Sequence, residues 1–403
     1  MVWRPPNPRL AGSRPALRGG VAVMLLGSAL ASACNLLLDN EERSLASDLG
    51  PQPVRGPSDA APGDGPSDGG SSCSKDLKTD PRNCGACGRD CLAGACSAGR
   101  CQPFTLAASQ SAPRNLVVEQ GVAYWLTGAR SEVVASCPVA GCNGAPAQVV
   151  KVADTLAITG LAVRGSTVFV LTVATSGGGA GTLATCPTNG CATPTKIADT
   201  SAGPYSLVLD AANMFFLTQV PSVVRCPLPA CAGGPVAIAQ GGTSGWFEMI
   251  ADDTSLYWWG TGPSMDITKS IVYRTSKLND GGLPSTLLSS VPRPRLAVRG
   301  ARLYVADNDG DAGAIYSVDL AGLNRTTVAS AELRPQGIAT DATDVYWAQG
   351  GADGGLRRCG LGGCDGGPTS VVDKQNDPAS PLVTSTAIFW TEFGGGTVRG
   401  LAK

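Results

Sequence analysis

The segment NLVVEQGVAYWLT, residues 115–127, joins an apolar strand to an aromatic strand through a short turn, and it decides the fold because it recurs. Six later segments repeat the pattern: GLAVRGSTVFVLT (160–172), SLVLDAANMFFLT (206–218), EMIADDTSLYWWG (248–260), RLAVRGARLYVAD (295–307), GIATDATDVYWAQ (337–349) and PLVTSTAIFWTE (381–392). Their aromatic anchors lie 42 to 47 residues apart: Tyr124, Phe169, Phe215, Tyr257, Tyr304, Tyr346 and Phe389. A sequence period in the forties is typical of propellers and solenoids.

Each repeat continues with a loop and two more short segments of strand character. In the first repeat these segments are EVVASC (132–137) and AQVVKVAD (147–154). Four short strands per repeat predict one blade of a β-propeller. The seventh repeat stops after its third strand, GTVRGLAK (396–403), whereas FTLAA (104–108) precedes the first repeat. We therefore predict an all-β, seven-bladed propeller over residues 102–403, in which residues 104–108 complete the last blade and so remove its exposed sheet edges.

A motif with two cysteines five positions apart, CPVAGC (137–142), falls between the third and fourth strands of the first blade. It returns as CPTNGC (186–191), CPLPAC (226–231) and CGLGGC (359–364). Proline fixes φ and glycine permits positive φ, as a tight turn requires. The motif predicts a disulfide across each hairpin turn: Cys137–Cys142, Cys186–Cys191, Cys226–Cys231 and Cys359–Cys364. Redox catalysis is the alternative, but reactive pairs usually have the CxxC spacing.

Residues 1–34 have the form of an export signal. Arginines precede an apolar run of roughly 15 residues, which is shorter than the about 20 that span a bilayer. The run ends in LASAC (30–34), which resembles the bacterial lipobox and predicts lipidation of Cys34. An ordinary signal-peptidase site nearby is the alternative. We expect an exported protein that is lipid-anchored to the bacterial envelope, in the outer membrane or periplasm, or is otherwise secreted.

Two segments precede the propeller. Residues 35–72 are rich in Pro, Gly, Ser and Asp, which predicts a disordered linker. Residues 73–101 carry six cysteines, at positions 73, 84, 87, 91, 96 and 101. Because exported proteins retain disulfides, we expect a small disulfide-rich module whose connectivity the sequence leaves open. Cys84-x-x-Cys87 leaves a zinc or redox site as the alternative. The segment resembles short Cys-rich modules of myxobacterial secreted proteins, which implies no activity.

The composition excludes several classes of function. The chain has no histidine, which excludes Ser-His-Asp and Cys-His catalysis and zinc sites that contain histidine. Its 31 basic and 32 acidic residues give a net charge of -1, so we expect no nucleic-acid partner and no membrane contact beyond the lipid anchor. No carboxylate pair suited to glycoside hydrolysis stands out, and we assign no catalytic residue. We expect a monomer.

Candidate binding residues stand just before the inner strands of the blades. Propellers bind ligands on the face formed by the loops between strands two and three and by the connections between blades. Hairpin turns, including the cysteine motifs, form the opposite face, from which the Cys-rich module enters. The predicted mouth of the channel carries side chains suited to a small polar or anionic group: Arg114, Asn115, Ser206, Glu248, Arg295 and Gln336. Solvated channel lining is the alternative role.

One acidic loop suggests a cation. Asp307, Asp309 and Asp311 place carboxylates at alternate positions, a spacing that suits Ca²⁺. Ala312 and Val318 replace the glycine and glutamate of an EF-hand, and a simple acidic turn is the alternative. No other cofactor is expected. Trp259, which we expect to be exposed in a neighbouring loop, is suited to stacking on a sugar ring or to packing between blades.

The aromatic strands resemble the YWTD repeats of propellers of the low-density-lipoprotein-receptor type, most closely at LYVAD (303–307) and IYSVDLAGLNRTTV (315–328). That family usually has six blades and lacks the cysteine turns. The resemblance implies an extracytoplasmic interaction scaffold that is not an enzyme. We therefore predict a non-catalytic scaffold that binds an envelope protein or polysaccharide. The alternatives are a propeller hydrolase, lyase or lactonase that uses Asp and Glu, with or without Ca²⁺, and a passive envelope component.

Overall fold

The computed structural model describes residues 76–403 except 177–178, 201, 221, 242–245 and 262–265. The predicted export signal and linker, Cys34 and Cys73 lie outside the described residues. Contacts divide the chain after Leu49, and all described residues belong to the second unit, Gly50–Lys403. In this described part, no helix is both long enough and apolar enough to cross a membrane.

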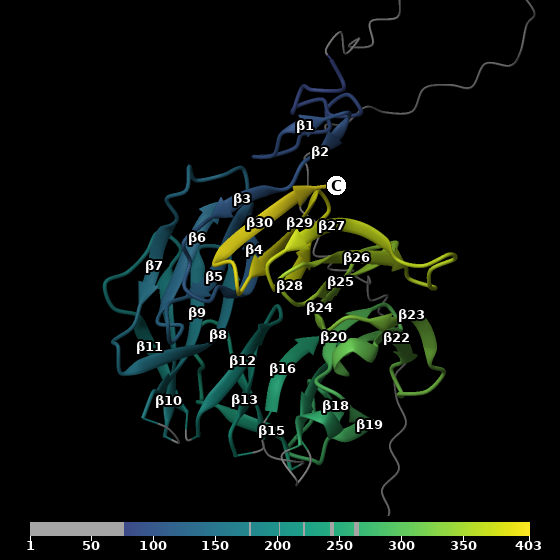
Figure 1. Ribbon diagram of the computed structural model, residues 1–403. Helices are drawn as coiled ribbons and strands as arrows, with labels where there is room; N and C mark the ends of the chain where they lie inside the picture. Colours follow the sequence, from purple (N-terminus) through teal and green to yellow (C-terminus); the bar gives the residue numbers. More distant parts are fainter. Residues whose placement is uncertain (1–75, 177–178, 201, 221, 242–245, 262–265) are drawn as a thin grey trace, which may run out of the picture. The chain divides into compact units, whose positions relative to one another are not determined.

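Seven antiparallel sheets of four strands make up the propeller (Figure 1). Blade 1 contains β4 (Arg114–Glu119), β5 (Val122–Thr127), β6 (Val133–Pro138) and β7 (Ala147–Lys151). Blade 2 contains β8 (Leu156–Arg164), β9 (Thr167–Ala174), β10 (Gly181–Pro187) and β11 (Thr195–Thr200). Blade 3 contains β12 (Pro204–Leu209), β13 (Asn213–Thr218), β14 (Ser222–Pro227) and β15 (Val236–Gln240). Blades 4 and 5 contain β16 (Trp246–Ala251), β17 (Ser255–Gly260), β18 (Ser270–Ser276) and β19 (Ser285–Val291); and β20 (Arg295–Arg299), β21 (Arg302–Asp307), β22 (Gly313–Asp319) and β23 (Thr326–Glu332).

Blades 6 and 7 complete the ring. They contain β24 (Pro335–Thr340), β25 (Asp344–Gln349), β26 (Gly354–Gly360) and β27 (Thr369–Gln375); and β28 (Pro378–Val383), β29 (Ala387–Glu392), β30 (Thr397–Ala402) and β3 (Phe104–Ala107). The first strands contact one another in sequence, and β28 contacts β4, so the ring is closed. Two short 3-10 helices, η1 (Ile267–Lys269) and η2 (Gly310–Ala312), lie in loops.

The closing strand is the one that the sequence predicts. Phe104 lies opposite Gly400 and Thr105 opposite Arg399 in the antiparallel pair of β3 and β30. The Leu106 side chain is almost completely buried. The all-β, seven-bladed propeller closed by an N-terminal strand is thereby confirmed.

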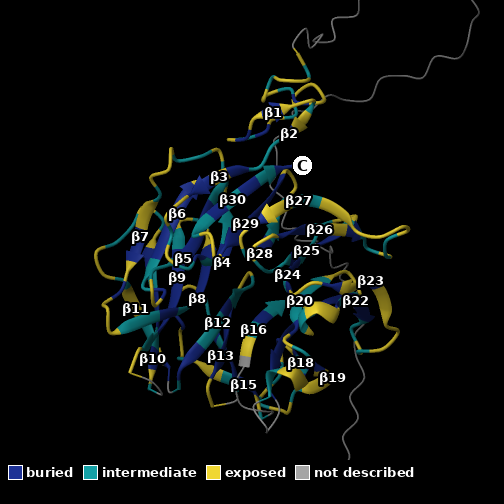
Figure 2. Cartoon of the chain, in the orientation of Figure 1, coloured by how far each residue is buried: buried dark blue, intermediate teal, exposed yellow. Residues whose placement is uncertain are grey.

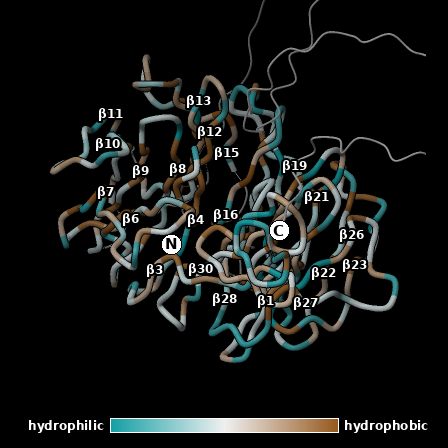
Figure 3. Tube along the Cα trace, turned by 90° about the horizontal axis from the view of Figure 1, so that it is seen from above, coloured by the Kyte–Doolittle hydropathy of each residue, from teal (hydrophilic) through white to brown (hydrophobic). Residues whose placement is uncertain are grey.

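The core lies between neighbouring blades. Phe215 of blade 3, for example, packs in one cluster with Met249 and Trp258 of blade 4. The buried residues follow the strands (Figure 2), and the hydrophobic segments follow the same strands when the molecule is seen from above (Figure 3). Strands rich in aromatic and branched residues form because each blade offers an apolar face to both neighbours.

Buried tryptophans add a polar contact to three of these interfaces. In each case the indole Nε1 donates to a side chain at or just beyond the end of the preceding blade's outer strand. The pairs are Trp125 with Gln110 at 3.0 Å, Trp347 with Glu332 at 2.7 Å, and Trp390 with Gln375 at 3.2 Å. All three pairs are 15 residues apart in sequence. The contact therefore belongs to the repeat itself.

Four hairpin turns between third and fourth strands carry disulfides. They join Cys137 to Cys142, Cys186 to Cys191, Cys226 to Cys231, and Cys359 to Cys364. We call the face that bears these turns the staple face. In blade 5, which has no cysteine at this position, Asp319 accepts hydrogen bonds from the backbone N–H groups of Ala321 and Leu323. Side-chain capping there takes the place of a covalent link.

The Cys-rich module packs on the staple face. Two disulfides, Cys84–Cys96 and Cys91–Cys101, hold it together beside the short strands β1 (Cys96–Ser97) and β2 (Arg100–Cys101). The Arg89 Nε donates to the Lys403 carbonyl at 2.8 Å. Leu92 packs against the cluster that contains Cys137. The module thus enters the propeller from the face that carries the stapled turns.

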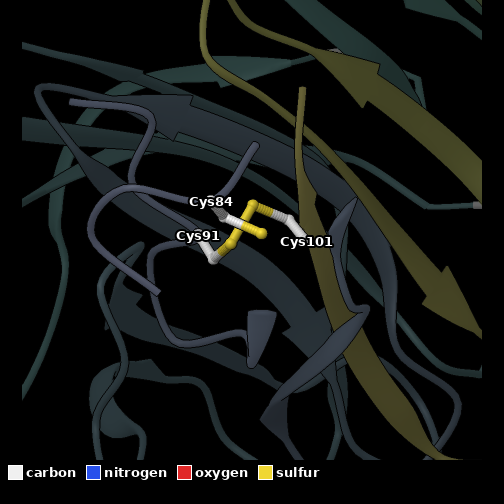
Figure 4. Close-up of side chains that lie close together, drawn as sticks. All are labelled: Cys84, Cys91 and Cys101. Atoms are coloured by element: carbon white, nitrogen blue, oxygen red, sulfur yellow. A yellow bond between two sulfur atoms is a disulfide. The ribbon is translucent and has the colours of Figure 1, made fainter. Parts of the chain in front are cut away.

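Three sulfur atoms of the module lie close together (Figure 4). They belong to Cys84, Cys91 and Cys101, and they are the only group of potential metal ligands that the described residues bring within reach of one ion. Each of the three is in a disulfide, and a disulfide sulfur is not the thiolate that binds zinc. Cys87, the second cysteine of the Cys84-x-x-Cys87 motif, is exposed and forms no disulfide among the described residues. The zinc alternative is not supported by this geometry.

Candidate functional site: the mouth of the central cavity

The seven first strands surround a cavity of about 1880 Å³. Every blade contributes to its lining, as expected from a ring whose first strands are innermost. All six binding residues proposed from the sequence line it: Arg114, Asn115, Ser206, Glu248, Arg295 and Gln336. The structure therefore brings these residues, which span more than half of the chain, around one space.

A repeated β-bulge shapes the lining. The pairing of first and second strands shifts register in six blades, and blade 5 alone pairs without a shift. The extra residues include Asn115, Ser206 and Ser380, each with positive φ. A bulge leaves a residue outside the ladder and re-aims its side chain. Polar side chains thus reach the cavity from strands that are otherwise apolar.

Several of these polar side chains bind the next blade. Thr159 Oγ1 donates to the carbonyl of Pro204 at 2.5 Å, and Ser206 Oγ accepts from the Met249 N–H at 3.0 Å. Gln336 Nε2 donates to Asp377 Oδ1 at 2.8 Å. Ser206 and Gln336 are therefore already engaged in holding neighbouring blades together. The sequence analysis missed Thr159 and Asp377, because their role depends on a partner in a different repeat.

The side chains that line the cavity are more basic than acidic. Four arginines, at positions 114, 130, 293 and 295, face two carboxylates, Glu248 and Asp377. Asp377 Oδ1 is occupied, since it accepts from Gln336 and from the Gly351 N–H. The ion pairs of the described residues include none of the four arginines. The mouth therefore carries guanidinium groups that form no direct ion pair, although Glu132 and Glu248 lie within electrostatic range of Arg114 and Arg295.

Arg114 and Glu248 sit deep in this lining. Burial lowers the pKa of the Arg114 guanidinium, and the negative charge of Glu132 acts in the opposite direction. Burial raises the pKa of the Glu248 carboxyl, while Arg295 and the Leu296 N–H lower it. Glu248 Oε2 and Arg114 Nε have no accessible surface and no hydrogen-bond partner among the described residues. Both charged groups are thus held where water solvates them poorly.

An aromatic stack occupies the blade 4 side of the cavity. The rings of Phe247 and Trp259 are stacked with centroids 4.3 Å apart and an interplanar angle of 21°. The Arg295 guanidinium lies 5.7 Å from the centroid of Trp259. Trp259 is only 4% exposed, whereas Phe247 is 42% exposed. The expectation of an exposed Trp259 is therefore wrong, and the accessible ring is that of Phe247, which the sequence analysis missed.

The acidic loop of blade 5 does not gather its carboxylates. Asp311 turns toward Arg334, with 3.7 Å between the charged atoms. Burial and the neighbouring Asp309 raise the pKa of Asp307 to about 6, and Arg325 lowers it. Within the described residues, Asp307, Asp309 and Asp311 do not converge closely enough to hold one ion. Calcium binding at this loop remains a prediction without geometric support.

Comparisons with known proteins agree on the fold. No protein-family model and no curated protein matches the chain. Among solved structures, it is similar to YCF48 bound to D1 peptide, with a TM-score of 0.55, 12% identity, and coverage of 75% of this chain and 94% of that one. YCF48 from Cyanidioschyzon merolae gives a TM-score of 0.53, 11% identity, and coverage of 74% and 98%. At such identities the similarity shows the propeller fold alone.

Proposed function

We propose that the chain is a non-catalytic binding scaffold outside the cytoplasm, and that the mouth of its cavity holds an envelope or extracellular partner through anionic groups. The observation that carries the proposal is the set of four cavity arginines without an ion-pair partner among the described residues. A guanidinium offers several fixed donors and binds carboxylate or phosphate well. Arg130 and Arg295 each donate to a backbone carbonyl, and a partner with negative charge would supply the anionic acceptors that the ion pairs of the described residues do not provide.

The proposed location follows from cysteine chemistry. Six disulfides among the described residues indicate an exported or extracellular protein, because reducing compartments do not maintain them. The proposal includes lipidation of Cys34 and attachment of the protein to the envelope. It also includes a YWTD-type propeller and a Cys-rich module of the myxobacterial type. With the Cys-rich module on the staple face, a tether on that side would leave the cavity mouth directed away from the membrane.

The proposed partner is either a protein or a polysaccharide that carries anionic groups. YCF48 has been solved with a bound D1 peptide, so a propeller of similar fold accommodates a peptide. Acidic polysaccharides offer the same carboxylates on a different backbone. Both classes are therefore represented among the probes below.

The test uses two soluble probes, a galacturonate hexamer and a glutamate hexamer, titrated calorimetrically into the intact exported protein. We expect at least one probe to bind, more weakly at higher salt, and Arg295→Gln to weaken that binding at least tenfold because a charge-assisted contact is lost. Arg299→Gln is the matched control, since Arg299 is exposed at the turn after β20, on the staple face. If neither probe binds, or if both variants lose affinity equally, the proposal is refuted.

A further inference from the structure

The exposed ring of Phe247 is held in a fixed position at the cavity mouth. Phe247 and Glu248 are the two residues of β16 that oppose Trp259 in the bulge between Trp246 and Met249. Stacking on Trp259 fixes the orientation of the phenyl ring and leaves its outer face open to the cavity. A flat apolar surface that is ordered before a ligand arrives loses little entropy on binding. Such a ring is suited to stacking.

Basic and acidic side chains line the cavity together with this ring. The Arg295 guanidinium lies 5.7 Å from the centroid of Trp259, and its Nη1 donates only to the Pro294 carbonyl among the described contacts. Arg293, two residues earlier, is exposed and also lines the cavity. Glu248, the next residue of the bulge, also lines the cavity. We call Phe247, Glu248, Trp259, Arg293 and Arg295 the Phe247 shelf.

A pyranose matches this combination of groups. One face of a sugar ring presents C–H groups, which pack on an aromatic ring, and its hydroxyls both donate and accept hydrogen bonds. A glutamate peptide would use the arginines, but it has no flat face to place on the phenyl ring. Two arginines against one glutamate favour a sugar that itself carries a carboxylate.

We propose, on the basis of the proposed function, that the Phe247 shelf binds a uronic-acid unit of an acidic polysaccharide. The C–H face of the pyranose stacks on Phe247, and its carboxylate accepts hydrogen bonds from Arg293 and Arg295. A second exposed phenyl ring, Phe393 after β29 of blade 7, also lines the cavity. Blades 4 and 7 are three positions apart in the ring of seven, so an oligosaccharide that crosses the mouth meets a ring on either side.

The experiment compares three probes on the intact protein: a galacturonate hexamer, its fully methyl-esterified form and a glutamate hexamer. We expect the galacturonate hexamer to bind most tightly, and esterification to weaken binding about tenfold because it removes the charge but keeps the ring. Phe247→Leu keeps an apolar side chain without a flat face and should weaken galacturonate binding about tenfold. Phe247→Tyr keeps the ring and should stay within about threefold of the wild type.

Control and contrary outcomes are distinct. Leu278→Ala removes another exposed apolar side chain, in the turn of blade 4 on the staple face, and should leave binding unchanged. Glutamate-hexamer binding that depends on Arg295 but not on Phe247, together with weak galacturonate binding, would overturn the shelf and leave the proposed function standing. Unchanged affinity of the Phe247→Leu variant for both acidic probes would also overturn the shelf. Failure of both acidic probes to bind would overturn the shelf and the proposed function together.

Discussion

Replacing Trp347 by phenylalanine tests how the blades are held together. The indole is fully buried, and its Nε1 donates to Glu332 Oε2 at 2.7 Å. Glu332 is 4% exposed, and the same oxygen also accepts from Gln349 Nε2 at 2.8 Å. Trp347→Phe removes one of two donors to a buried carboxylate. A hydrogen bond to a charged group contributes about 1.5–3 kcal/mol, and the smaller ring costs about 1–2 kcal/mol more. We expect a total loss of about 2.5–5 kcal/mol.

Two other tryptophans provide matched controls. Trp125 and Trp390 are equally buried, but they donate to the neutral amides of Gln110 and Gln375. Trp→Phe at these positions removes the same ring volume and a bond of about 0.5–1.5 kcal/mol. Urea unfolding followed by circular dichroism should therefore rank Trp347→Phe as about 1–2 kcal/mol more damaging than either control. In a Glu332→Gln background this excess should disappear. Equal losses at all three tryptophans would refute the role given to the charge.

Two further predictions concern pH and the stapled turns. Because burial raises the pKa of Asp307 to about 6, this carboxyl binds more protons in the folded protein than in the unfolded chain between roughly pH 4 and 6. The contribution of Asp307 to stability therefore falls as pH rises through that window and is constant above it. Asp307→Asn should therefore stabilise the protein by about 1–2 kcal/mol at pH 7.5, after allowance for solvent screening, and by almost nothing at pH 4; a constant difference across a pH series of thermal unfolding would contradict this. The double change Cys137→Ala and Cys142→Ala opens a link between residues five apart and should cost about 2 kcal/mol in urea unfolding, whereas unchanged stability would show that the turn is already fixed without it.

The ring could be predicted because its signals are local. An apolar strand, a turn and an aromatic strand are visible in each repeat, and the missing strand of the last repeat left only one segment, around Leu106, to complete it. Four cysteine pairs at hairpin spacing marked the same turns independently. Such features depend on near neighbours in the sequence and on a period, both of which can be counted without coordinates.

The details of the cavity depend on contacts between repeats. Ser206 and Gln336 line the cavity, but their hydrogen bonds reach into the next blade, which no pattern within one repeat records. Trp259 was expected to be exposed in a loop, yet it lies in β17, Phe247 stacks on its ring and its side chain is only 4% exposed. A bulge inserts Phe247 beside it, and a bulge of one residue leaves no clear mark in an apolar sequence.

The acidic loop of blade 5 shows a different limit. Alternate aspartates suggest a cation when their side chains converge, but η2 intervenes and Asp311 approaches Arg334 instead. A cation site depends on the path of the backbone between its ligands as much as on their spacing. Spacing alone could not distinguish these outcomes.

Closure of the ring has a consequence for biosynthesis. In blade 7, Phe104 of β3 lies opposite Gly400 of β30. The first propeller strand to be synthesised therefore cannot pair until the last one has been synthesised. Until β30 is available, β3 has no partner and the nascent chain keeps two open strand edges, which are prone to non-native pairing. A chain interrupted before β30 would therefore be a substrate for proteases or aggregation instead of a stable six-bladed product. Because β3 and β30 must pair to close the ring, only a chain that extends through β30 can form the complete propeller.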